Sequence, residues 1–280
     1  MKANWITNKD GSIYHLGLHV ENISETIITV GDQNRVKSIS QYFDKLEFTK
    51  SNREFITHTG WIGNKRLTVI STGIGTDNID IVFNELDALF NIDLISGQPK
   101  DKFQKIDFIR IGTSGTIQKD IQLDSFLASN YCIGLDGLMH FYNYNEFLTI
   151  QEELNQHITI PSCITKASAE LLNFFSDPNI LIGNTVTCSG FYAPQGRSVR
   201  IESKEKDWLE KLSKLNLSIG RVTNLEMETS GIYGLSRMMG HQAISLNAIL
   251  ANRMTNEFSQ DAEKSIDQLI RLSLEKIEKR

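Results

Sequence analysis

The sequence alternates short apolar runs, rich in β-branched residues, with longer segments in which apolar residues recur every three or four positions. Short apolar runs of this kind are typical of buried strands. The runs that predict strands are 26–30, 67–71, 108–112, 180–187, 220–225 and 243–250. Helical periodicity is found at 79–90 and at 262–270. Strands that alternate with helices along a chain predict the α/β fold class.

Two connections refine this prediction. Residues 53–59 (REFITHT), followed by Trp61-Ile62-Gly63-Asn64, predict an antiparallel hairpin ahead of the strand at 67–71, so the sheet should be mixed. Residues 91–105 combine Gly-Gln-Pro with mixed charge and predict a surface loop. Because no repeat and no Pro/Gly/Ser-rich linker divides the chain, we expect one domain over residues 1–280.

The composition excludes several classes of function. A chain of 280 residues, 40% of them hydrophobic, can bury a large core. The formal charge of −5 is spread along the chain without a long basic run, which argues against nucleic-acid binding. The three cysteines match no zinc-ligand spacing and no disulfide framework, and no stretch reaches the ~18 apolar residues of a membrane span. We therefore expect a cytoplasmic protein without a metal site or a membrane partner.

Three predicted strands end in turns that are rich in glycine. These turns are Val30-Gly31-Asp32, residues 71–76 (STGIGT) and residues 111–115 (IGTSG). In open α/β sheets, ligands bind outside the carboxyl ends of the strands. Glycine allows a backbone N–H to approach an oxyanion closely, so such a turn can hold a phosphate. The alternative is that glycine serves only to let the chain leave the strand.

Arginines near these turns favour the anion-binding interpretation. Arg35 follows Gly31 by one helical turn, and Arg53 opens the predicted hairpin. Arg110 interrupts the apolar strand at 108–112, where a guanidinium is costly unless an anion or a carboxylate pairs with it. Taken singly, Arg35 and Arg53 are equally consistent with a solvated side chain or a structural ion pair.

A second cluster, residues 224–231 (NLEMETSG), marks the point where a strand gives way to a helix that begins near Glu228. Glu226 and Glu228 share one face if the backbone is extended, and a carboxylate can accept two hydrogen bonds from the vicinal diol of a ribose. The alternative is that glutamate in the first helical turn only stabilises the helix macrodipole.

A third cluster, residues 189–197 (SGFYAPQGR), places aromatic rings beside an amide and a guanidinium. A planar heterocycle with carbonyl and N–H edges would be held by this combination. The alternative is an ordinary exposed loop. Other catalytic patterns are absent from the sequence: there is no nucleophile elbow, no H-E-x-x-H zinc motif, no P-loop and no dinucleotide-binding fingerprint.

Taken in order along the chain, these clusters resemble the nucleoside phosphorylase I family, and within it the uridine phosphorylases. The matching strings are YHLGL (14–18), VGDQNRV (30–36), NREF (52–55), STGIG (71–75), RIGTSG (110–115), LDG with HF (135–141), FYAPQGR (191–197), LEMET (225–229) and NR (252–253). They span nearly the whole chain. The resemblance implies a three-layer α/β/α domain with a central mixed sheet.

The resemblance also implies roles for individual residues. Phosphate would be held by Gly31, Arg35, Arg110 and Thr113, and by Arg53 from a neighbouring subunit. Ribose would be contacted by Glu226, Met227 and Glu228, and by His15 from the partner chain. The base would be held by Phe191, Gln195, Arg197 and Arg253. The residues expected to act in catalysis are Arg35, Arg110, Arg197 and Glu228.

Such sites require a homo-oligomer, at least a dimer. The chain departs from the family pattern at Thr76-Asp77-Asn78, where bacterial relatives usually carry Gly-Pro-Ser, so the alkali-metal site that some relatives build is in doubt. The loop at 97–105 is longer than in the bacterial hexamers, which leaves dimer and hexamer both open.

The expected reaction is the reversible phosphorolysis of uridine, and of related pyrimidine nucleosides, with inorganic phosphate as co-substrate and no cofactor. A purine nucleoside phosphorylase would place an aspartate near residues 249–253 (ILANR), which carry no carboxylate. A nucleosidase would not need three arginines. A nucleoside-binding protein without activity is the alternative from a different class.

Overall fold

The computed structural model describes residues 7–280, in which one large mixed sheet has the strand order β11-β12-β10-β8-β13-β7-β1-β4-β3-β2. Two short strands extend it: β9 pairs with β8, and β14 pairs with β13. The strands of this sheet are β1 (Thr26–Val30), β2 (Lys45–Asn52), β3 (Phe55–Ile62), β4 (Lys65–Ser71), β7 (Asp107–Thr116), β8 (Phe126–Gly134), β9 (Cys163–Lys166), β10 (Ile180–Thr187), β11 (Asn216–Leu217), β12 (Gly220–Glu226), β13 (Gln242–Asn252) and β14 (Glu257–Phe258).

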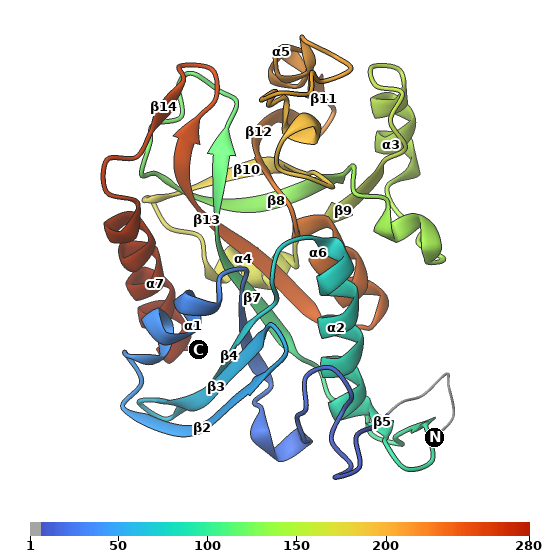
Figure 1. Cartoon of the computed structure of the whole chain (residues 1–280), viewed down its shortest axis with the longest axis vertical. Helices are drawn as coiled ribbons and strands as arrows, with labels where there is room; N and C mark the ends of the chain where they lie inside the picture. The colour runs from blue at the N-terminus through green and yellow to red at the C-terminus, as the bar shows by residue number, and fades with distance from the viewer. Residues whose placement is uncertain (1–6) are drawn as a thin grey trace.

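Helices cover the sheet on both sides. The α-helices are α1 (Gln33–Ser40), α2 (Thr76–Asn91), α3 (Leu148–Asn155), α4 (Ala169–Phe174), α5 (Trp208–Lys214), α6 (Thr229–Met238) and α7 (Ala262–Glu278). Three short 3₁₀ turns are η1 (Val20–Asn22), η2 (Leu138–Phe141) and η3 (Ala193–Gln195). In Figure 1, α1 and α7 lie on one side of the sheet, and α2 and α6 lie on the other. The predicted three-layer α/β/α class is therefore confirmed.

The predicted apolar periodicity forms the helix faces that pack on the sheet. On α2 the buried face includes Ile79, Val82, Phe83 and Leu86, none of which is exposed. On α7 the buried residues include Leu269 and Ile277. These side chains join one cluster with apolar residues of the central strands. Burial of such side chains contributes about 1.5–3 kcal/mol each.

All six predicted strands are present, and the predicted hairpin is the pair β3–β4, which turns at Gly63-Asn64. The sequence analysis did not predict β2, β8 or β9. Residues 91–105 lie largely on the surface, as expected, but they also contain the short antiparallel pair β5 (Ile92–Asp93) and β6 (Gln98–Pro99).

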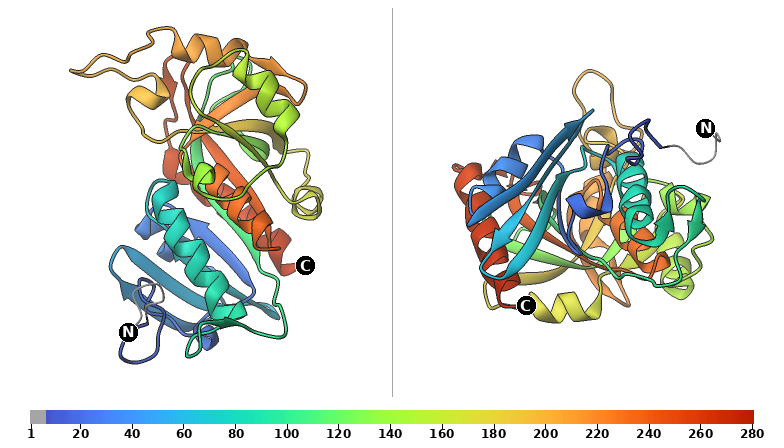
Figure 2. Two further views of the ribbon diagram at one scale, coloured as in Figure 1. Left: turned by 90° about the vertical axis from the view of Figure 1, so that its right-hand side faces the viewer. Right: turned by 90° about the horizontal axis from the view of Figure 1, so that it is seen from below.

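The sheet does not stay open, which the sequence analysis did not anticipate. Asn224 and Leu225 of β12 pair in antiparallel fashion with Thr116 and Gly115 of β7. This pairing closes β7, β13, β8, β10 and β12 into a ring of hydrogen-bonded strands. Figure 2 shows β7 and β13 running from this ring into the half of the sheet that contains β1 to β4. The carboxyl ends of β7 and β12 therefore lie next to each other.

Among the helices of residues 7–280, none is both long enough and apolar enough to cross a membrane.

Tyr233 ties α6 to the sheet, and we predict that its hydroxyl contributes to stability. Its side chain is buried; the hydroxyl donates to the Ser129 carbonyl oxygen (2.7 Å) and accepts from the Ser245 N–H (2.8 Å). Tyr233→Phe leaves both backbone groups unpaired, so the free energy of unfolding should fall by about 1–3 kcal/mol in urea denaturation. The control is Tyr131→Phe, because the Tyr131 hydroxyl has no hydrogen bond within residues 7–280. Equal losses in the two variants would contradict the prediction.

Candidate active site

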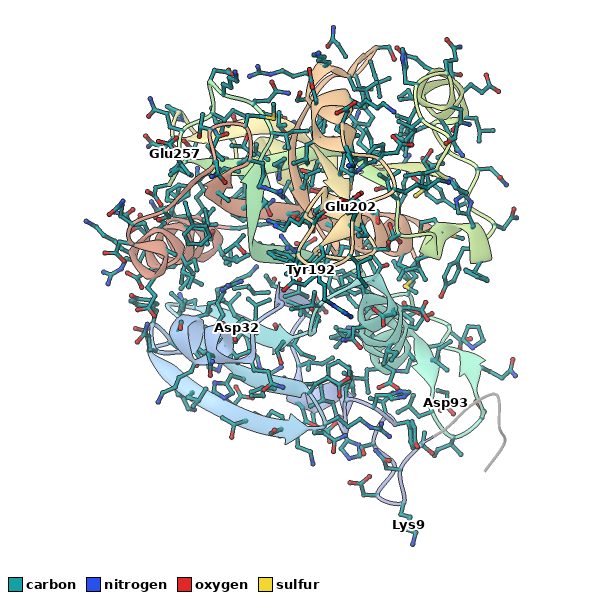
Figure 3. All side chains as sticks on the ribbon, turned by 45° about the horizontal axis from the view of Figure 1, so that its top comes forward. Lys9, Asp32, Asp93, Tyr192, Glu202 and Glu257 are labelled. Atoms are coloured by element: carbon teal, nitrogen blue, oxygen red, sulfur yellow. The ribbon has the colours of Figure 1, made fainter. Side chains whose placement is uncertain are left out.

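The glycine turns after β1 and β4 come together at one edge of the sheet. β1 lies between β4 and β7, and all three strands are parallel. A Cβ atom on Gly31 would lie 3.4 Å from the Gly73 carbonyl oxygen, so the two turns approach closely. Asp32 caps α1 by accepting from the Asn34 N–H (2.9 Å). In the view of Figure 3, Asp32 and Tyr192 both lie toward the middle of the molecule, far from the periphery at Lys9 and Glu257.

Arg35 extends from the first turn of α1 toward β7. Its Nη1 donates to the Ile111 carbonyl oxygen (3.4 Å), and its side chain is half-buried. Burial and the nearby charge of Arg110 lower the pKa of Arg35. The charges of Asp32 and Glu228 oppose this shift, although no ion pair joins the Arg35 guanidinium to a carboxylate within residues 7–280. Arg35 is therefore a partly desolvated cation, close to a second cation, without an ion pair of its own.

Arg110 is paired with carboxylates. Its place in an apolar strand predicted either an anion or a carboxylate as its partner. The side chain is only 5% exposed. Nη2 donates to Glu228 Oε2 (2.7 Å) and lies 3.4 Å from Glu226 Oε2. Burial lowers the pKa of Arg110, but the charges of Glu226 and Glu228 outweigh it, so the pKa is raised.

The two glutamates reach Arg110 from the point where β12 passes into α6. Glu226 Oε2 accepts from the N–H groups of Glu228 (2.8 Å) and Thr229 (2.9 Å), and its Oε1 accepts from the Thr187 hydroxyl. Burial raises the pKa of Glu226, while the charge of Arg110 opposes this shift. Glu228 Oε1 accepts from the Gly75 N–H (2.9 Å), so Glu228 also holds the turn after β4. Glu226 therefore has few acceptor positions left for a ligand. Glu228 has only two hydrogen-bond partners, so more of its acceptor positions are left for a ligand.

Gly112 makes room for the Arg110 side chain. The two residues lie on the same face of β7, because side chains two positions apart in a strand point the same way. A Cβ atom on Gly112 would lie 2.0 Å from Arg110 Nη1 and 2.3 Å from its Cζ. The glycine of this turn is therefore required for the position of the guanidinium, in addition to any contact with a ligand.

The predicted base-binding residues form a separate cluster. Arg197 Nη1 donates to Gln195 Oε1 (2.6 Å) and to the Phe191 carbonyl oxygen (2.7 Å), and its guanidinium lies over the Phe191 ring, 3.7 Å from the centroid. Arg253 Nη1 donates to the Gln195 carbonyl oxygen (3.0 Å). Gln195 is only 4% exposed, whereas the Phe191 ring is half exposed. Phe191, Gln195 and Arg197 of one segment thus meet Arg253 of a distant segment.

The electrostatics of this cluster suit an electron-rich ligand. Burial and the neighbouring charge of Arg253 lower the pKa of Arg197 to about 10. Burial also lowers the pKa of Arg253. Arg197 remains a cation at neutral pH, but its desolvated charge interacts more strongly with a nearby anion than a charge in water would.

His15 and Arg53, which the resemblance assigned to a neighbouring subunit, lie together at another part of the chain. The Arg53 guanidinium lies 5.2 Å from the centroid of the Tyr14 ring, which packs edge-on against His15. His15 Nδ1 lies 2.6 Å from Glu85 Oε1, and the His15 N–H also donates to this carboxylate. Neither residue contacts the Arg110 and Glu228 pair of its own chain.

The remaining predicted residues, Thr113 and Met227, are both half-buried. Thr113 belongs to the carboxyl-terminal half of β7, and Met227 stands between the two glutamates in the sequence. Two residues near Arg110 were missed: Ser245 and Asn247 of β13 are fully buried and accept hydrogen bonds from its Nη1. Their signal in the sequence was a pair of polar residues, two positions apart, in an apolar strand.

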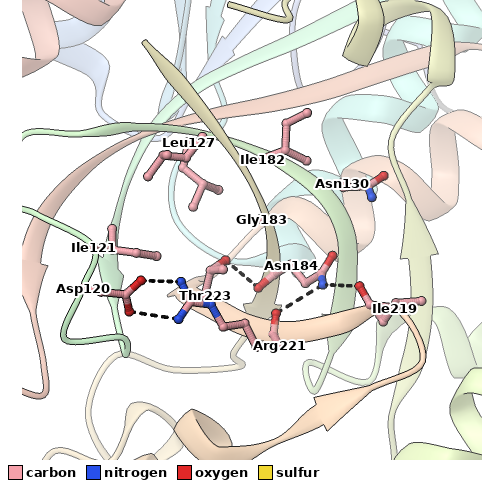
Figure 4. Close-up of a pocket in the computed structure, with 11 residues that line it drawn as sticks. Asp120, Ile121, Leu127, Asn130, Ile182, Gly183, Asn184, Ile219, Arg221 and Thr223 are labelled. Atoms are coloured by element: carbon pink, nitrogen blue, oxygen red, sulfur yellow. Dashed lines mark hydrogen bonds and ion pairs between the residues drawn. The ribbon is translucent and has the colours of Figure 1, made fainter. Parts of the chain in front are cut away.

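A cavity of about 310 Å³ lies away from these clusters, toward the amino ends of β8, β10 and β12. Figure 4 shows that the Asp120–Arg221 ion pair and the hydrogen bonds of Asn184 line it. It contains none of the predicted site residues.

The site thus consists of two polar clusters, one around Arg110 and one around Gln195. Residues 25–278 match the phosphorylase superfamily. The chain belongs to this superfamily, which confirms the predicted family and the predicted enzyme class, a pentosyltransferase.

Individual relatives cover nearly the whole chain. The uridine phosphorylase of Thermococcus kodakarensis is 28% identical over 259 residues, which are 91% of this chain and 83% of that protein. A DeoD-type purine nucleoside phosphorylase of Buchnera aphidicola is 25% identical over 94% of this chain and 98% of its own length. A Trypanosoma brucei nucleoside phosphorylase, described as showing uridine phosphorylase activity, superposes with a TM-score of 0.89 at 29% identity, covering 99% of this chain and 100% of that chain.

We predict that Gly112→Ala impairs the site without unfolding the protein. The added methyl group occupies the position of the Arg110 guanidinium, which must move. Misplacement of a catalytic group by about 1 Å lowers kcat/KM by roughly 100-fold. The control is Gly115→Ala on the same strand, where the nearest atom to a Cβ is at an ordinary 3.5 Å. Both variants should show the wild-type circular dichroism spectrum, although Gly112→Ala should melt at a lower temperature because the Arg110 ion pairs are displaced. Wild-type turnover by Gly112→Ala would refute the assignment.

Proposed function

We propose that this chain catalyses the reversible phosphorolysis of uridine, and of related pyrimidine nucleosides, to uracil and ribose 1-phosphate. Two similar proteins, the uridine phosphorylase of Thermococcus kodakarensis and the Trypanosoma brucei nucleoside phosphorylase described as showing uridine phosphorylase activity, support uridine as the substrate. The observation that carries the proposal is the placement of Arg35 beside Arg110. A half-buried guanidinium without a carboxylate partner, close to a second guanidinium, favours an anion as the missing ligand.

In the proposed complex, phosphate is held by Gly31, Arg35, Arg110 and Thr113. Glu228 and Met227 contact the ribose, and the Glu226 carboxylate supports them by capping α6. Arginine suits phosphate because its planar guanidinium donates two parallel hydrogen bonds. The Arg110–Glu228 contact places the two substrates side by side, as displacement at the anomeric carbon requires.

The pyrimidine lies among Phe191, Gln195, Arg197 and Arg253. The Phe191 ring offers a stacking face, and the Gln195 amide offers both a donor and an acceptor. Gln195 accepts from Arg197, so the amide nitrogen is directed away from that contact. These four residues therefore suit uracil, which has polar edges, better than they would suit a ring without polar groups.

The reaction needs no nucleophile from the protein. A phosphate oxygen forms the bond to the anomeric carbon as the bond from that carbon to the base nitrogen breaks, and the electron pair leaves with uracil. Arg35 and Arg110 orient the phosphate, and Glu228 orients the ribose. Arg197 stabilises the negative charge that develops on uracil only as the bond breaks, which is how an enzyme lowers the barrier.

The proposal also covers the domain organisation, the localisation, the assembly and the co-substrate of the enzyme. We propose a single domain over residues 1–280 in a cytoplasmic homo-oligomer, a dimer or a hexamer, with phosphate as co-substrate and no cofactor. In this assembly, His15 reaches the ribose and Arg53 the phosphate of a neighbouring site. The separation of these residues from Arg110 and Glu228 within one chain supports that arrangement.

The direct test is a panel of nucleosides incubated with and without inorganic phosphate, followed by measurement of base release. We predict that uracil release from uridine requires phosphate, because Arg35 and Arg110 act by positioning an oxyanion. Uridine should exceed inosine and cytidine by roughly 10⁴-fold in kcat/KM, since polar groups of the base site stay unpaired with either analogue. Equal release without phosphate would favour a nucleosidase, and efficient cleavage of inosine would favour a purine enzyme.

Subunit mixing tests the shared site. We predict that Arg53→Ala and Glu228→Ala chains are each inactive, but that a mixture regains activity. A mixed dimer contains one site with an intact Glu228 and an intact Arg53, so random pairing restores roughly a quarter of the wild-type sites. The control is each variant subjected alone to the same exchange procedure. No recovery, once subunit exchange is demonstrated, would mean that each site is built within one chain.

A further inference from the structure

We propose that Asn247 is a positioning residue that aims Arg110 at phosphate, and that its neutral amide is required for phosphate affinity. The inference rests on the proposed phosphorolysis, because it assigns phosphate to the site around Arg110. Asn247 lies on β13, outside every motif that carried the family resemblance. Its side chain is fully buried.

The geometry places the Asn247 amide opposite the guanidinium. β13 is parallel to β7, with Asn247 in register with Gly112 and Ser245 in register with Arg110. The Arg110 guanidinium extends over Gly112, which has no side chain, and Nη1 reaches Asn247 Oδ1 at 2.8 Å. Ser245 Oγ accepts a longer hydrogen bond from the same nitrogen (3.3 Å). Asn247 is therefore the nearer of the two acceptors that fix Nη1.

The amide is itself held in one orientation. Asn247 Nδ2 lies 3.2 Å from Ser129 Oγ and 3.3 Å from Ser245 Oγ. Ser129 in turn shares a hydrogen bond with Thr185 (2.6 Å). If the amide were rotated by 180°, its NH₂ group would face Arg110 Nη1 and that hydrogen bond would be lost, although the serine hydroxyls could still donate to the amide oxygen. Because a guanidinium only donates, Arg110 requires Oδ1 on its side, and the serine hydroxyls accept from Nδ2 on the other.

The charge of the surroundings explains why a neutral acceptor suits this position. Arg110 already contacts two carboxylates, Glu226 and Glu228, so the three groups together carry more negative than positive charge if all are ionised. A third carboxylate would orient Nη1 equally well, but it would repel a phosphate. An amide orients the guanidinium without adding negative charge, so the positive charge of Arg35 stays available to the substrate.

The test compares Asn247→Asp and Asn247→Ala with the wild-type enzyme in steady-state kinetics. Asn247→Asp keeps the shape and the acceptor oxygen but adds a negative charge, so the KM for phosphate should rise by about tenfold or more. Asn247→Ala removes the acceptor, and the KM for phosphate should also rise. The KM for uridine should change much less in both variants, because the base cluster is separate.

The matched control is Asn184, a buried asparagine of β10 whose amide donates to the carbonyl oxygens of Ile219 and Arg221. Asn184→Asp and Asn184→Ala make the same chemical changes away from Arg110. Both control variants should keep the wild-type KM for phosphate, even if their melting temperatures fall. A purely structural role for Asn247 would instead lower stability and leave the ratio of the two KM values unchanged.

The outcomes separate this inference from the proposed function. Uracil release by the wild-type enzyme without phosphate would overturn the proposed function. If the wild type requires phosphate and both Asn247 variants keep its KM for phosphate, the positioning role is wrong. If neither Asn247 variant folds, Ser129→Ala decides, because Ser129 Oγ contacts the Asn247 amide and not the Arg110 side chain. An increased KM for phosphate then supports the inference, and an unchanged value overturns it.

Discussion

A guanidinium buried within the sheet constrains the structure around it. Arg110 is 5% exposed, and an unpaired charge at such a depth would be strongly destabilising. Its surroundings satisfy it in three ways: Glu226 and Glu228 supply negative charge, Asn247 supplies a neutral acceptor, and Gly112 supplies space. Each comes from the end of a strand or from the strand beside it. The position of one side chain thus depends on several elements that are distant in the sequence.

Closure of the strand ring brings these elements together. In an open sheet, β12 would lie several strands away from β7, because β10, β8 and β13 stand between them in the strand order. The antiparallel contact of Asn224 and Leu225 with β7 removes that separation. The same contact lets the Asn224 amide donate to Ser114 Oγ (3.0 Å) beside Thr113. The pairing of two strand ends therefore has a direct chemical consequence, since it brings Glu226 and Glu228, at the end of β12, to Arg110 of β7.

Local chemistry predicted much of this from the sequence, and long-range pairing limited the rest. Six of the strands, α2 and α7 followed from apolar runs and periodicity, and Arg110 was predicted to have an anionic partner because it interrupts an apolar strand. The identity of that partner was not predictable, because Glu226 and Glu228 reach it only through ring closure. Asn247 was missed for a different reason: β13 lies directly beside β7, but two polar residues in an apolar strand do not reveal which neighbouring strand they face.

Arg35 and Arg110 show how surroundings give one residue type two different tasks. Two carboxylates raise the pKa of Arg110 and keep it charged inside the sheet, whereas burial and the Arg110 charge lower the pKa of Arg35. Most of the cost of burying Arg110 is already offset by the protein. The cost of desolvating Arg35 is offset less, because it has no ion pair within residues 7–280 and only the charges of Asp32 and Glu228 at longer range favour its cation. In the proposed complex, an anion therefore gains more from Arg35 than from a cation that is already neutralised, and Arg110 mainly contributes direction.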